Sequence, residues 1–138
     1  MAFKNALLVI SPYYQNIAQY LEKGATHAFK AAGFNVDRVF VPGALELAPA
    51  IAAKKGKYGC FVALGCIQRG DTSHYDVVVR ESAAGITLLT VNHAMAVGNG
   101  ILTVENEWQA LQRANPYYGD KGGEAARAAL SLWSLINE

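Results

Sequence analysis

Charged side chains are scarce in this chain: they make up 17% of its 138 residues, whereas 52% are hydrophobic. That charge content is low for a soluble monomer, so we expect a sheet buried on both faces and a surface that partner subunits partly cover. The 12 basic and 11 acidic residues leave a net charge of +1. The densest basic cluster, Lys54, Lys55 and Lys57, follows a predicted helix, where cations favour the helix dipole. Because nucleic-acid binding requires a basic stripe, we expect no nucleic-acid partner.

Cysteines and long apolar runs are also few. Cys60 and Cys66 lie in or beside one predicted strand, so roughly 20 Å separates them, whereas a disulfide requires Cα atoms about 4.4–6.8 Å apart. They therefore do not pair, and since their spacing is not that of a metal site we expect buried thiols and no metal. No apolar run approaches the ~20 residues of a membrane span, and the first run, residues 6–10, is too short for a signal peptide. We expect a cytoplasmic protein with no membrane partner.

Short apolar runs alternate with segments of helical periodicity. The predicted strands are residues 6–10, 36–41, 58–64 and 95–104, the last interrupted by Gly98, Asn99 and Gly100, and the predicted helices are residues 17–32, 45–55, 75 to about 92, 106–114 and 123–136. Such alternation predicts right-handed crossovers and a parallel sheet between two helix layers. No linker or repeat interrupts the pattern, so we predict a single domain over residues 1–138. Ligands bind such sheets at the carboxyl ends of the strands, where the strand order reverses.

The most informative segment is the predicted loop from Gly65 to His74, which lies between a buried strand and the start of a helix. Free backbone N–H groups at a helix start, together with the positive end of its dipole, attract phosphate or carboxylate. A histidine there can exchange a proton near neutral pH. A histidine considered alone is most often structural, but beside Arg69, Gly70 and Asp71 at this junction a functional role is favoured.

Other predicted loops hold further candidates, each with a plainer alternative. Tyr13 and Tyr14 are adjacent aromatics that could stack on a flat ring, or they could pack against a neighbouring loop or subunit. Glu46 could accept hydrogen bonds from hydroxyls, or it could simply be a helix N-terminal glutamate. Arg113 and Lys121 could clamp a phosphate, or they could be surface charges, and spacing does not exclude three rivals: Arg38, Arg69 and Arg80. The residues alone thus predict a small phosphorylated ligand and acid–base chemistry.

Four segments together resemble one known family, the dimethyl-ribityllumazine synthases. They are Val41-Pro42-Gly43-Ala44-Leu45-Glu46, the segment from Leu64 to Asp76, Leu102-Thr103-Val104-Glu105-Asn106 with Gln109 and Ala110, and Asp120-Lys121-Gly122-Gly123-Glu124-Ala125. The resemblance covers nearly the whole chain in order. It implies a flavodoxin-like α/β fold, a three-layer α/β/α sandwich with a four-stranded parallel sheet. It also implies two small-molecule substrates and no cofactor: a ribitylamino-aminouracil condenses with dihydroxybutanone phosphate, and phosphate and water are lost, in riboflavin biosynthesis.

The resemblance also implies roles for individual positions. Proton transfer is assigned to His74. Phosphate binding is assigned to Gly70, Asp71, Thr72 and Arg113. Ring and ribityl binding is assigned to Tyr13, Ala44, Leu45, Glu46, Cys66, Ile67, Gln68, Asn99 and Lys121.

Two of these positions depart from the family pattern, and the family's assembly adds a further expectation. Asn99 stands where many relatives carry a phenylalanine that packs on the ring from the neighbouring subunit, and Gln68 is unusual in its loop. Asn99 therefore mildly favours an alternative, a flavodoxin-like binding module that holds a flavin or lumazine without turnover. The family builds each site between two subunits, so we expect a homo-oligomer, a ring of five subunits. We expect a free pentamer or a pair of them rather than a shell of twelve rings, because only five residues precede Ala6.

Overall fold

A computed structural model describes residues 3–71 and 73–138 of the chain. Thr72, one of the predicted phosphate-binding residues, therefore lies outside the described residues. The strands are β1 (Asn5–Ile10), β2 (Asn35–Phe40), β3 (Cys60–Gln68) and β4 (Val97–Val104). The helices are α1 (Gln15–Ala31), the short 3-10 helix η1 (Ala44–Glu46), α2 (Leu47–Ala53), α3 (Tyr75–Asn92), α4 (Glu107–Ala114) and α5 (Lys121–Ile136). Strands and helices alternate as predicted.

The four strands form one parallel sheet in the order β2-β1-β3-β4. The chain moves from β1 outward to β2, and then crosses back to β3 and on to β4. The strand order therefore reverses between β1 and β3, and this is the position where parallel sheets leave a crevice for ligands. The backbone amide of Ser11, just beyond β1, donates to the carbonyl of Leu64 in β3 at 2.9 Å, so the two strands stay paired up to that point.

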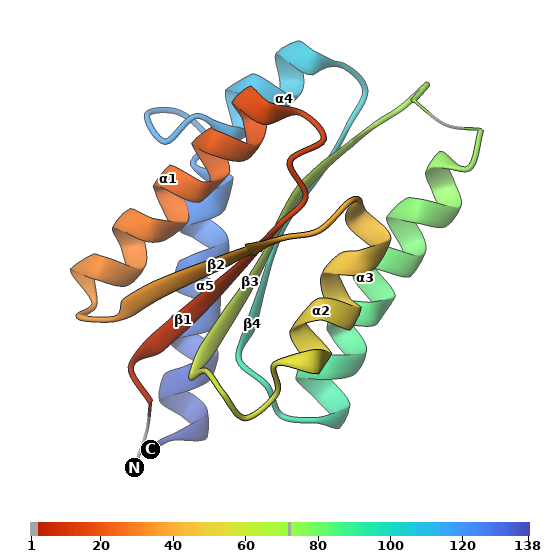
Figure 1. The fold of residues 1–138 in the computed structure, drawn as a ribbon. Helices are drawn as coiled ribbons and strands as arrows, with labels where there is room; N and C mark the ends of the chain where they lie inside the picture. Colours follow the sequence, from red (N-terminus) through yellow and green to blue (C-terminus); the bar gives the residue numbers. More distant parts are fainter. Residues whose placement is uncertain (1–2, 72) are drawn as a thin grey trace.

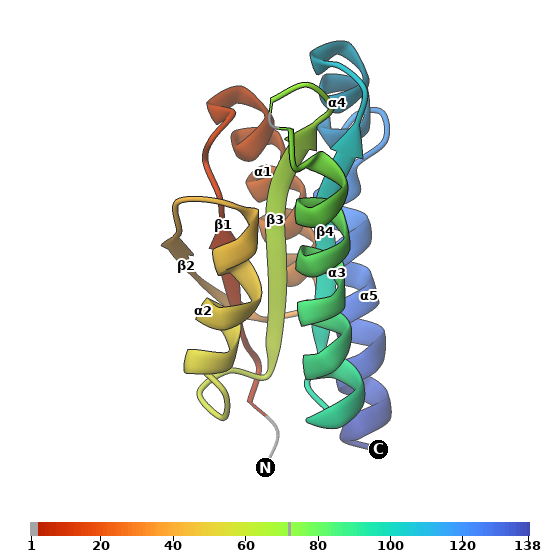
Figure 2. The same ribbon diagram turned by 90° about the vertical axis from the view of Figure 1, so that its right-hand side faces the viewer.

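Helices cover both faces of the sheet, and this gives three layers (Figures 1 and 2). Alternate residues of β1 point to opposite faces, as the two-residue period of a strand requires. Leu8 packs with α1 and α5, whereas Leu7 and Val9 pack with α2 and α3. All three are fully buried, which confirms the prediction that the apolar runs are strands covered on both sides. The fold is thus the predicted flavodoxin-like α/β sandwich.

The prediction for the third strand was wrong at its carboxyl end. The sequence suggests a loop from Gly65, but β3 continues to Gln68. The extension pairs with β4 in register, with Cys66 opposite Leu102 and Gln68 opposite Val104. Pairing with a neighbouring strand outweighs the low strand propensity of a glycine, because strand propensity depends strongly on context.

The predicted interruption of the fourth strand is also wrong, since β4 runs without a break through Gly98 and Gly100. A Cβ atom at Gly98 would overlap the carbonyl group of Ala125 in α5, and one at Gly100 would lie 2.6 Å from the Leu64 side chain. These glycines therefore serve close packing between the strand, its neighbour and a helix, which is a recognised use of glycine in strands.

The β2 edge of the sheet is much more exposed than its centre. Every residue of β2 is exposed or half-buried, whereas β1 is buried from Ala6 onward. Over residues 3–71 and 73–138, no helix is long and apolar enough to cross a membrane.

Candidate active site

Three loops follow the carboxyl ends of β1, β2 and β3, in the upper half of Figure 1. They follow Ile10, Phe40 and Gln68, and they hold most of the predicted site residues. The helices that begin beyond these loops point their amino ends toward the same edge of the sheet, because parallel strands connected by crossovers all run in one direction. The first group of site residues is built from these three loops.

The first loop carries two adjacent tyrosines in different environments. Tyr13 is 70% exposed, whereas Tyr14 is partly buried against the core. Their rings meet edge to face, with centroids 4.9 Å apart. The Tyr14 hydroxyl donates a hydrogen bond to the carboxylate of Asp71. Tyr14 therefore ties the loop after β1 to the loop after β3, and the Tyr13 ring is left open at the rim.

The second loop brings backbone and a carboxylate close together. Gly43 is extended and precedes η1, which ends at Glu46. A Cβ atom at Gly43 would lie 3.1 Å from Oε1 of Glu46, so this carboxylate lies over the glycine. Leu45 is 46% exposed, and Ala44 packs against the core between the sheet and α3. The predicted ribityl-binding residues thus lie together on one short turn.

The third loop leads from β3 into α3. The amide of Asp71 donates to the Gln68 carbonyl at 3.3 Å, and Gly70 has a φ of +97°, a conformation that side chains disfavour. His74 is the N-cap residue of α3, and its carbonyl accepts from the Val78 amide at 3.0 Å. The predicted helix start near Tyr75 is confirmed. The loop therefore presents backbone N–H groups at a helix amino terminus, which is a suitable place for an anion.

The residues at the end of β3 are more buried than the loop that follows. Ile67 and Gln68 are buried and Cys66 is half-buried. Burial raises the pKa of the Cys66 thiol to about 11, although the Gln68 amide opposes the shift, and burial raises the pKa of Cys60 to about 12. Both thiols stay protonated near neutral pH, so neither has the thiolate that a cysteine nucleophile requires.

The three rivals for the phosphate-binding arginine each have a carboxylate partner. Arg69 donates from Nε to both oxygens of Glu105 and lies 4.4 Å from the centroid of the Tyr75 ring. Arg38 in β2 pairs with Glu22 in α1, and Arg80 lies 3.6 Å from the Glu81 carboxylate in α3. Because these guanidinium groups already have anionic partners, they fit a phosphate clamp less well.

A second group of predicted residues lies on the other side of β4. Arg113 in the last turn of α4 and Lys121 at the start of α5 line one hollow of about 410 Å³, with Thr103 of β4 and Glu124. Lys121 Nζ lies 3.2 Å from the Glu124 carboxylate. Over residues 3–71 and 73–138, no carboxylate forms an ion pair with Arg113. Its guanidinium is therefore the better candidate for an external anion.

Asn99 joins neither group within one chain. It lies in the amino half of β4, opposite Ala63, and its side-chain oxygen accepts from the Ile101 amide at 2.9 Å. Five residues separate it from the end of the strand at Val104, which corresponds to roughly 17 Å. Its side chain is exposed on the open edge of the sheet.

Sequence reasoning missed two residues that shape the site. Tyr14 was considered, with Tyr13, only as a ring for stacking, whereas its hydroxyl bonds to Asp71, 57 positions away in the sequence. Glu105 was named only as part of the segment from Leu102 to Asn106 that resembles the family. In the structure it accepts a hydrogen bond from Arg69 and so links the loops after β3 and β4. Neither partner is close in sequence, so no local signal pointed to these pairs.

Comparison with known proteins places this arrangement in a family. The family model described as 6,7-dimethyl-8-ribityllumazine synthase matches residues 4–137. A protein of that name from Novosphingobium aromaticivorans is 50% identical over 131 residues, which cover 94% of each chain. One from Beijerinckia indica is 48% identical over 136 residues, or 96% of this chain and 75% of that protein. A third, 6,7-dimethyl-8-ribityllumazine synthase 1 of Rhizobium meliloti, is 49% identical over 94% of this chain and 89% of its own.

Proposed function

The chain belongs to the family of 6,7-dimethyl-8-ribityllumazine synthases, and we propose on this basis that it condenses 5-amino-6-ribitylamino-uracil with 3,4-dihydroxy-2-butanone 4-phosphate. The product is 6,7-dimethyl-8-ribityllumazine, and phosphate and water are released. The protein is thus a transferase of riboflavin biosynthesis. The observation that carries this conclusion is the family match over residues 4–137, and the gathering of three loops at one end of the sheet supports it.

The ring and ribityl chain occupy the first group of residues. The exposed Tyr13 ring stacks on the pyrimidine, and the turn from Ala44 to Glu46 holds the ribityl hydroxyls, with the Glu46 carboxylate as acceptor. Cys66, Ile67 and Gln68 form the floor at the end of β3. These residues are half-buried or buried, so they contribute through backbone and shape. Leu45 covers the substrate from the side with its exposed apolar surface.

The phosphate and the proton transfers belong to the start of α3. The loop segment before α3, to which Gly70, Asp71 and Thr72 belong by sequence, binds the phosphate near the positive end of the helix dipole. The Asp71 carboxylate accepts from the Tyr14 hydroxyl, and the Asp71 amide donates to the Gln68 carbonyl, so both groups hold the loop in shape beside the helix start. His74 moves protons as the reaction proceeds. A positioned base of this kind contributes roughly 10²–10⁴-fold in rate.

Little covalent chemistry is required of the protein. An amine attacks the ketone to give an imine, phosphate leaves by elimination, and a second attack closes the ring. Holding two reactants in the correct orientation can supply about 7–11 kcal/mol in well-aligned cases. Side chains that position the substrates therefore matter at least as much as the proton carrier.

The site is completed by a second subunit. Arg113 and Lys121 line a hollow beside β4, and no hydrogen bond or ion pair among the described residues links that hollow to the loops after β1, β2 and β3. We assign Arg113 and Lys121, together with Asn99 on the open edge of β4, to the site of a neighbouring copy. Arg113 then meets the phosphate and Asn99 faces the ring.

Exposed aromatic side chains support such an assembly. Trp108 in α4 is 68% exposed and Tyr117, in the loop before α5, is 84% exposed, whereas large aromatic groups are normally covered at subunit interfaces. Head-to-tail contacts that close into a ring of five subunits would cover them. We favour the free pentamer or a pair of pentamers, and the cytoplasmic location stays a prediction from the sequence.

The test of the function is direct. Purified protein mixed with both substrates should release phosphate and form the fluorescent lumazine faster than the substrates alone. Arg80→Ala, which removes an exposed arginine paired with Glu81 on α3, is a matched control that should keep full activity. If the protein binds lumazine but never exceeds the uncatalysed rate, the binding-module alternative replaces the enzyme.

A further inference from the structure

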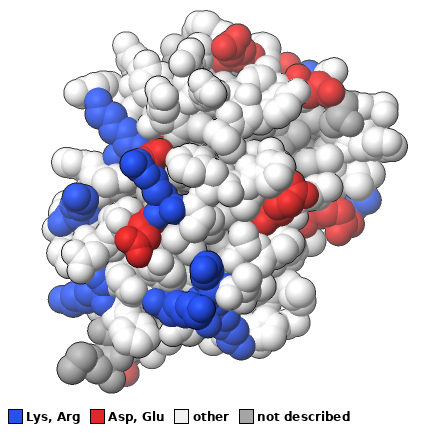
Figure 3. All heavy atoms as spheres, in the orientation of Figure 1, with Lys and Arg blue, Asp and Glu red and all other residues white. Residues whose placement is uncertain are grey.

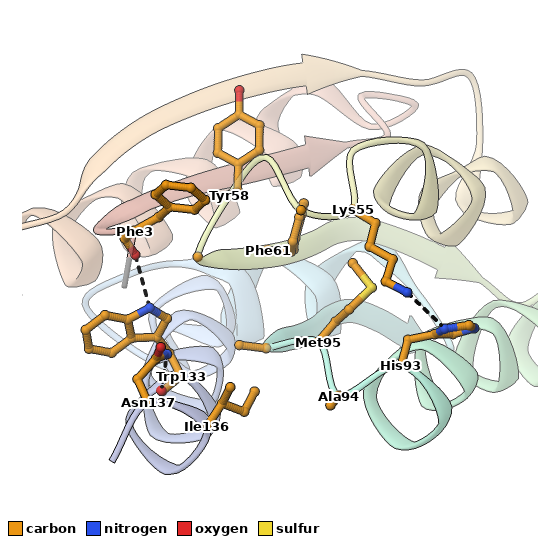
Figure 4. A pocket seen from close by; sticks show the side chains of 13 residues that line it. Phe3, Lys55, Tyr58, Phe61, His93, Ala94, Met95, Trp133, Ile136 and Asn137 are labelled. Carbon is orange, nitrogen blue, oxygen red and sulfur yellow. Dashed lines mark hydrogen bonds between the residues drawn. The ribbon is translucent and has the colours of Figure 1, made fainter. Parts of the chain in front are cut away.

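A second pocket lies at the opposite end of the sheet from the candidate active site. It has a volume of about 280 Å³ and is lined by residues that precede β1, β3 and β4 and by the end of α5. Figure 4 shows its walls, which are mainly aromatic or apolar: Phe3, Tyr58, Phe61, Met95, Trp133 and Ile136. This pocket shares no residue with the site proposed for lumazine synthesis.

The aromatic walls are held in place by partners behind them. The Trp133 indole donates from Nε1 to the Phe3 carbonyl at 3.0 Å, and its ring meets Phe34 edge to face at 5.1 Å. Tyr58 donates to the Asp37 carboxylate at 2.8 Å, and its ring meets Phe61 at 5.9 Å. The polar atoms of both rings are satisfied and their faces are fixed, so the pocket is preformed, as small-molecule sites usually are.

The other side of the pocket is basic. Lys55 Nζ lies 3.3 Å from Nδ1 of His93, and Figure 4 shows this pair across the cavity from Trp133. No aspartate or glutamate is among the described residues that line the cavity. The Lys55 ammonium donates to this imidazole nitrogen and has further N–H groups to offer, and no carboxylate on the described lining pairs with it.

The surface around this pocket also carries positive charge. Lys54 and Lys57 flank Lys55 in the turn after α2. In Figure 3, which has the orientation of Figure 1, basic side chains predominate on the lower side of the molecule, where the strands begin, and acidic ones gather on the upper right. The local field therefore favours the approach of an anion to this end.

The backbone beside His93 is strained. Ala94 has a φ of +50°, in the left-handed region that costs a residue with a Cβ about 1–2 kcal/mol. The turn closes α3, since the Met95 amide donates to the Leu89 carbonyl at 3.3 Å, and it sets His93 on the rim of the pocket. Non-glycine residues in this conformation are found preferentially at binding sites.

We propose that this pocket is a second small-molecule site, which takes a planar aromatic monocarboxylate. The ring lies among Phe61, Met95 and Trp133, and the carboxylate accepts hydrogen bonds from Lys55 and His93. Aromatic rings and the Met95 thioether provide favourable contacts to a flat ring. A charge-assisted bond to an ammonium group then selects the anion over a neutral analogue of the same shape.

The experiment uses 2-naphthoate as the probe and 2-naphthamide as its neutral counterpart, with the intact assembly. Trp108→Phe leaves Trp133 as the single tryptophan, so its fluorescence reports on the pocket wall. We expect saturable quenching by naphthoate with one site per chain. We also expect binding about tenfold or more weaker for naphthamide, consistent with the loss of a charged hydrogen bond.

Two lysine variants test whether Lys55 contacts the carboxylate of the probe. Lys55→Met should weaken naphthoate binding about tenfold and leave naphthamide binding unchanged, whereas Lys57→Met, outside the cavity lining, should change neither by more than about twofold. Both variants should keep lumazine synthesis, which also verifies that they fold. If Lys55→Met fails to fold, the difference in affinity between naphthoate and naphthamide for the parent protein still tests the proposal.

Several outcomes would overturn the proposal. They are equal binding of the two probes, equal effects of Lys55→Met and Lys57→Met, no change in Trp133 fluorescence, or displacement of naphthoate by the aminouracil substrate. The last result would place the probe in the lumazine-forming site. Failure of lumazine synthesis without loss of naphthoate binding would instead contradict the proposed function alone.

Discussion

Arg69 and Glu105 join the loops that follow two neighbouring strands, β3 and β4. The Nε atom of Arg69 lies 2.8 Å and 3.1 Å from the two carboxylate oxygens of Glu105, and both side chains are more than half exposed. The pair closes the edge of the site between these loops. It also engages Arg69, one of the three arginines that by sequence alone were rivals to Arg113 for phosphate.

We expect the Arg69–Glu105 pair to add little stability. Exposed ion pairs contribute about 0–1 kcal/mol, so a double-mutant cycle with Arg69→Met and Glu105→Gln should give a coupling free energy within that range. Urea unfolding of the four proteins measures it. A coupling well above about 1 kcal/mol would mean that solvent screens the pair less than its exposure suggests.

Arg113→Ala should reduce activity more than His74→Ala. A lost charge-assisted contact to phosphate is worth about 1.5–3 kcal/mol, or roughly 10- to 150-fold in kcat/KM, and water or the substrate amine can partly replace a lost proton carrier. Steady-state kinetics with both substrates provide the comparison, and Arg80→Ala is the control for loss of an exposed arginine. A larger loss in the His74 variant would reverse the ranking.

Mixing the two variants tests whether the site is shared. In a head-to-tail ring, each site would take His74 from one copy and Arg113 from the next. When the two variants mix at random, roughly a quarter of the sites then contain both unmutated residues. Refolding Arg113→Ala and His74→Ala together should therefore restore activity that neither has alone. Absence of complementation would mean that each chain builds its own site.

The size of the assembly is measured separately. Light scattering coupled to size exclusion should give five or ten chains per particle. A stable, active monomer would contradict the shared site, whereas a shell of twelve pentamers would contradict only the preference for small assemblies.

Ala94→Gly should stabilise the protein. Glycine removes the steric cost of a φ of +50°, about 1–2 kcal/mol, and part of that gain is offset by the greater entropy of glycine in the unfolded chain, about 0.4–1 kcal/mol. We expect a net gain of about 0.5–1 kcal/mol in the free energy of unfolding. Ala84→Gly, at an exposed position within α3, is the control and should destabilise by about 1 kcal/mol.

The buried thiols should make the protein less stable at alkaline pH. Their pKa values rise from 9.0 to about 12 for Cys60 and about 11 for Cys66, so between pH 9 and these values the folded chain binds more protons than the unfolded chain. The free energy of unfolding must then fall as pH rises through this window. Denaturation of the parent and of Cys60→Ala/Cys66→Ala from pH 8 to 11 measures the difference, and parallel curves would contradict the burial of the thiols.

The sequence by itself determined the order of elements and the chemistry of the third loop. The apolar run from Ala6 to Ile10 and the helical periodicity from Ile17 onward are local patterns, and local patterns fix the type of an element. Pairing of parallel strands is not local. For this reason the continuation of β3 to Gln68, and of β4 through Gly98, was visible only once the strands lay in register.

Only the tertiary structure decided which site residues lie together. Tyr14 and Asp71, or Arg69 and Glu105, are distant in sequence, and they meet because strands with a common direction bring their carboxyl ends to one edge. The same geometry places Arg113 and Lys121 beside the carboxyl half of β4, in a hollow that the loops after β1, β2 and β3 do not line. A sequence carries the identity of these residues, but the distances between them arise from the packing of helices on both faces of the sheet.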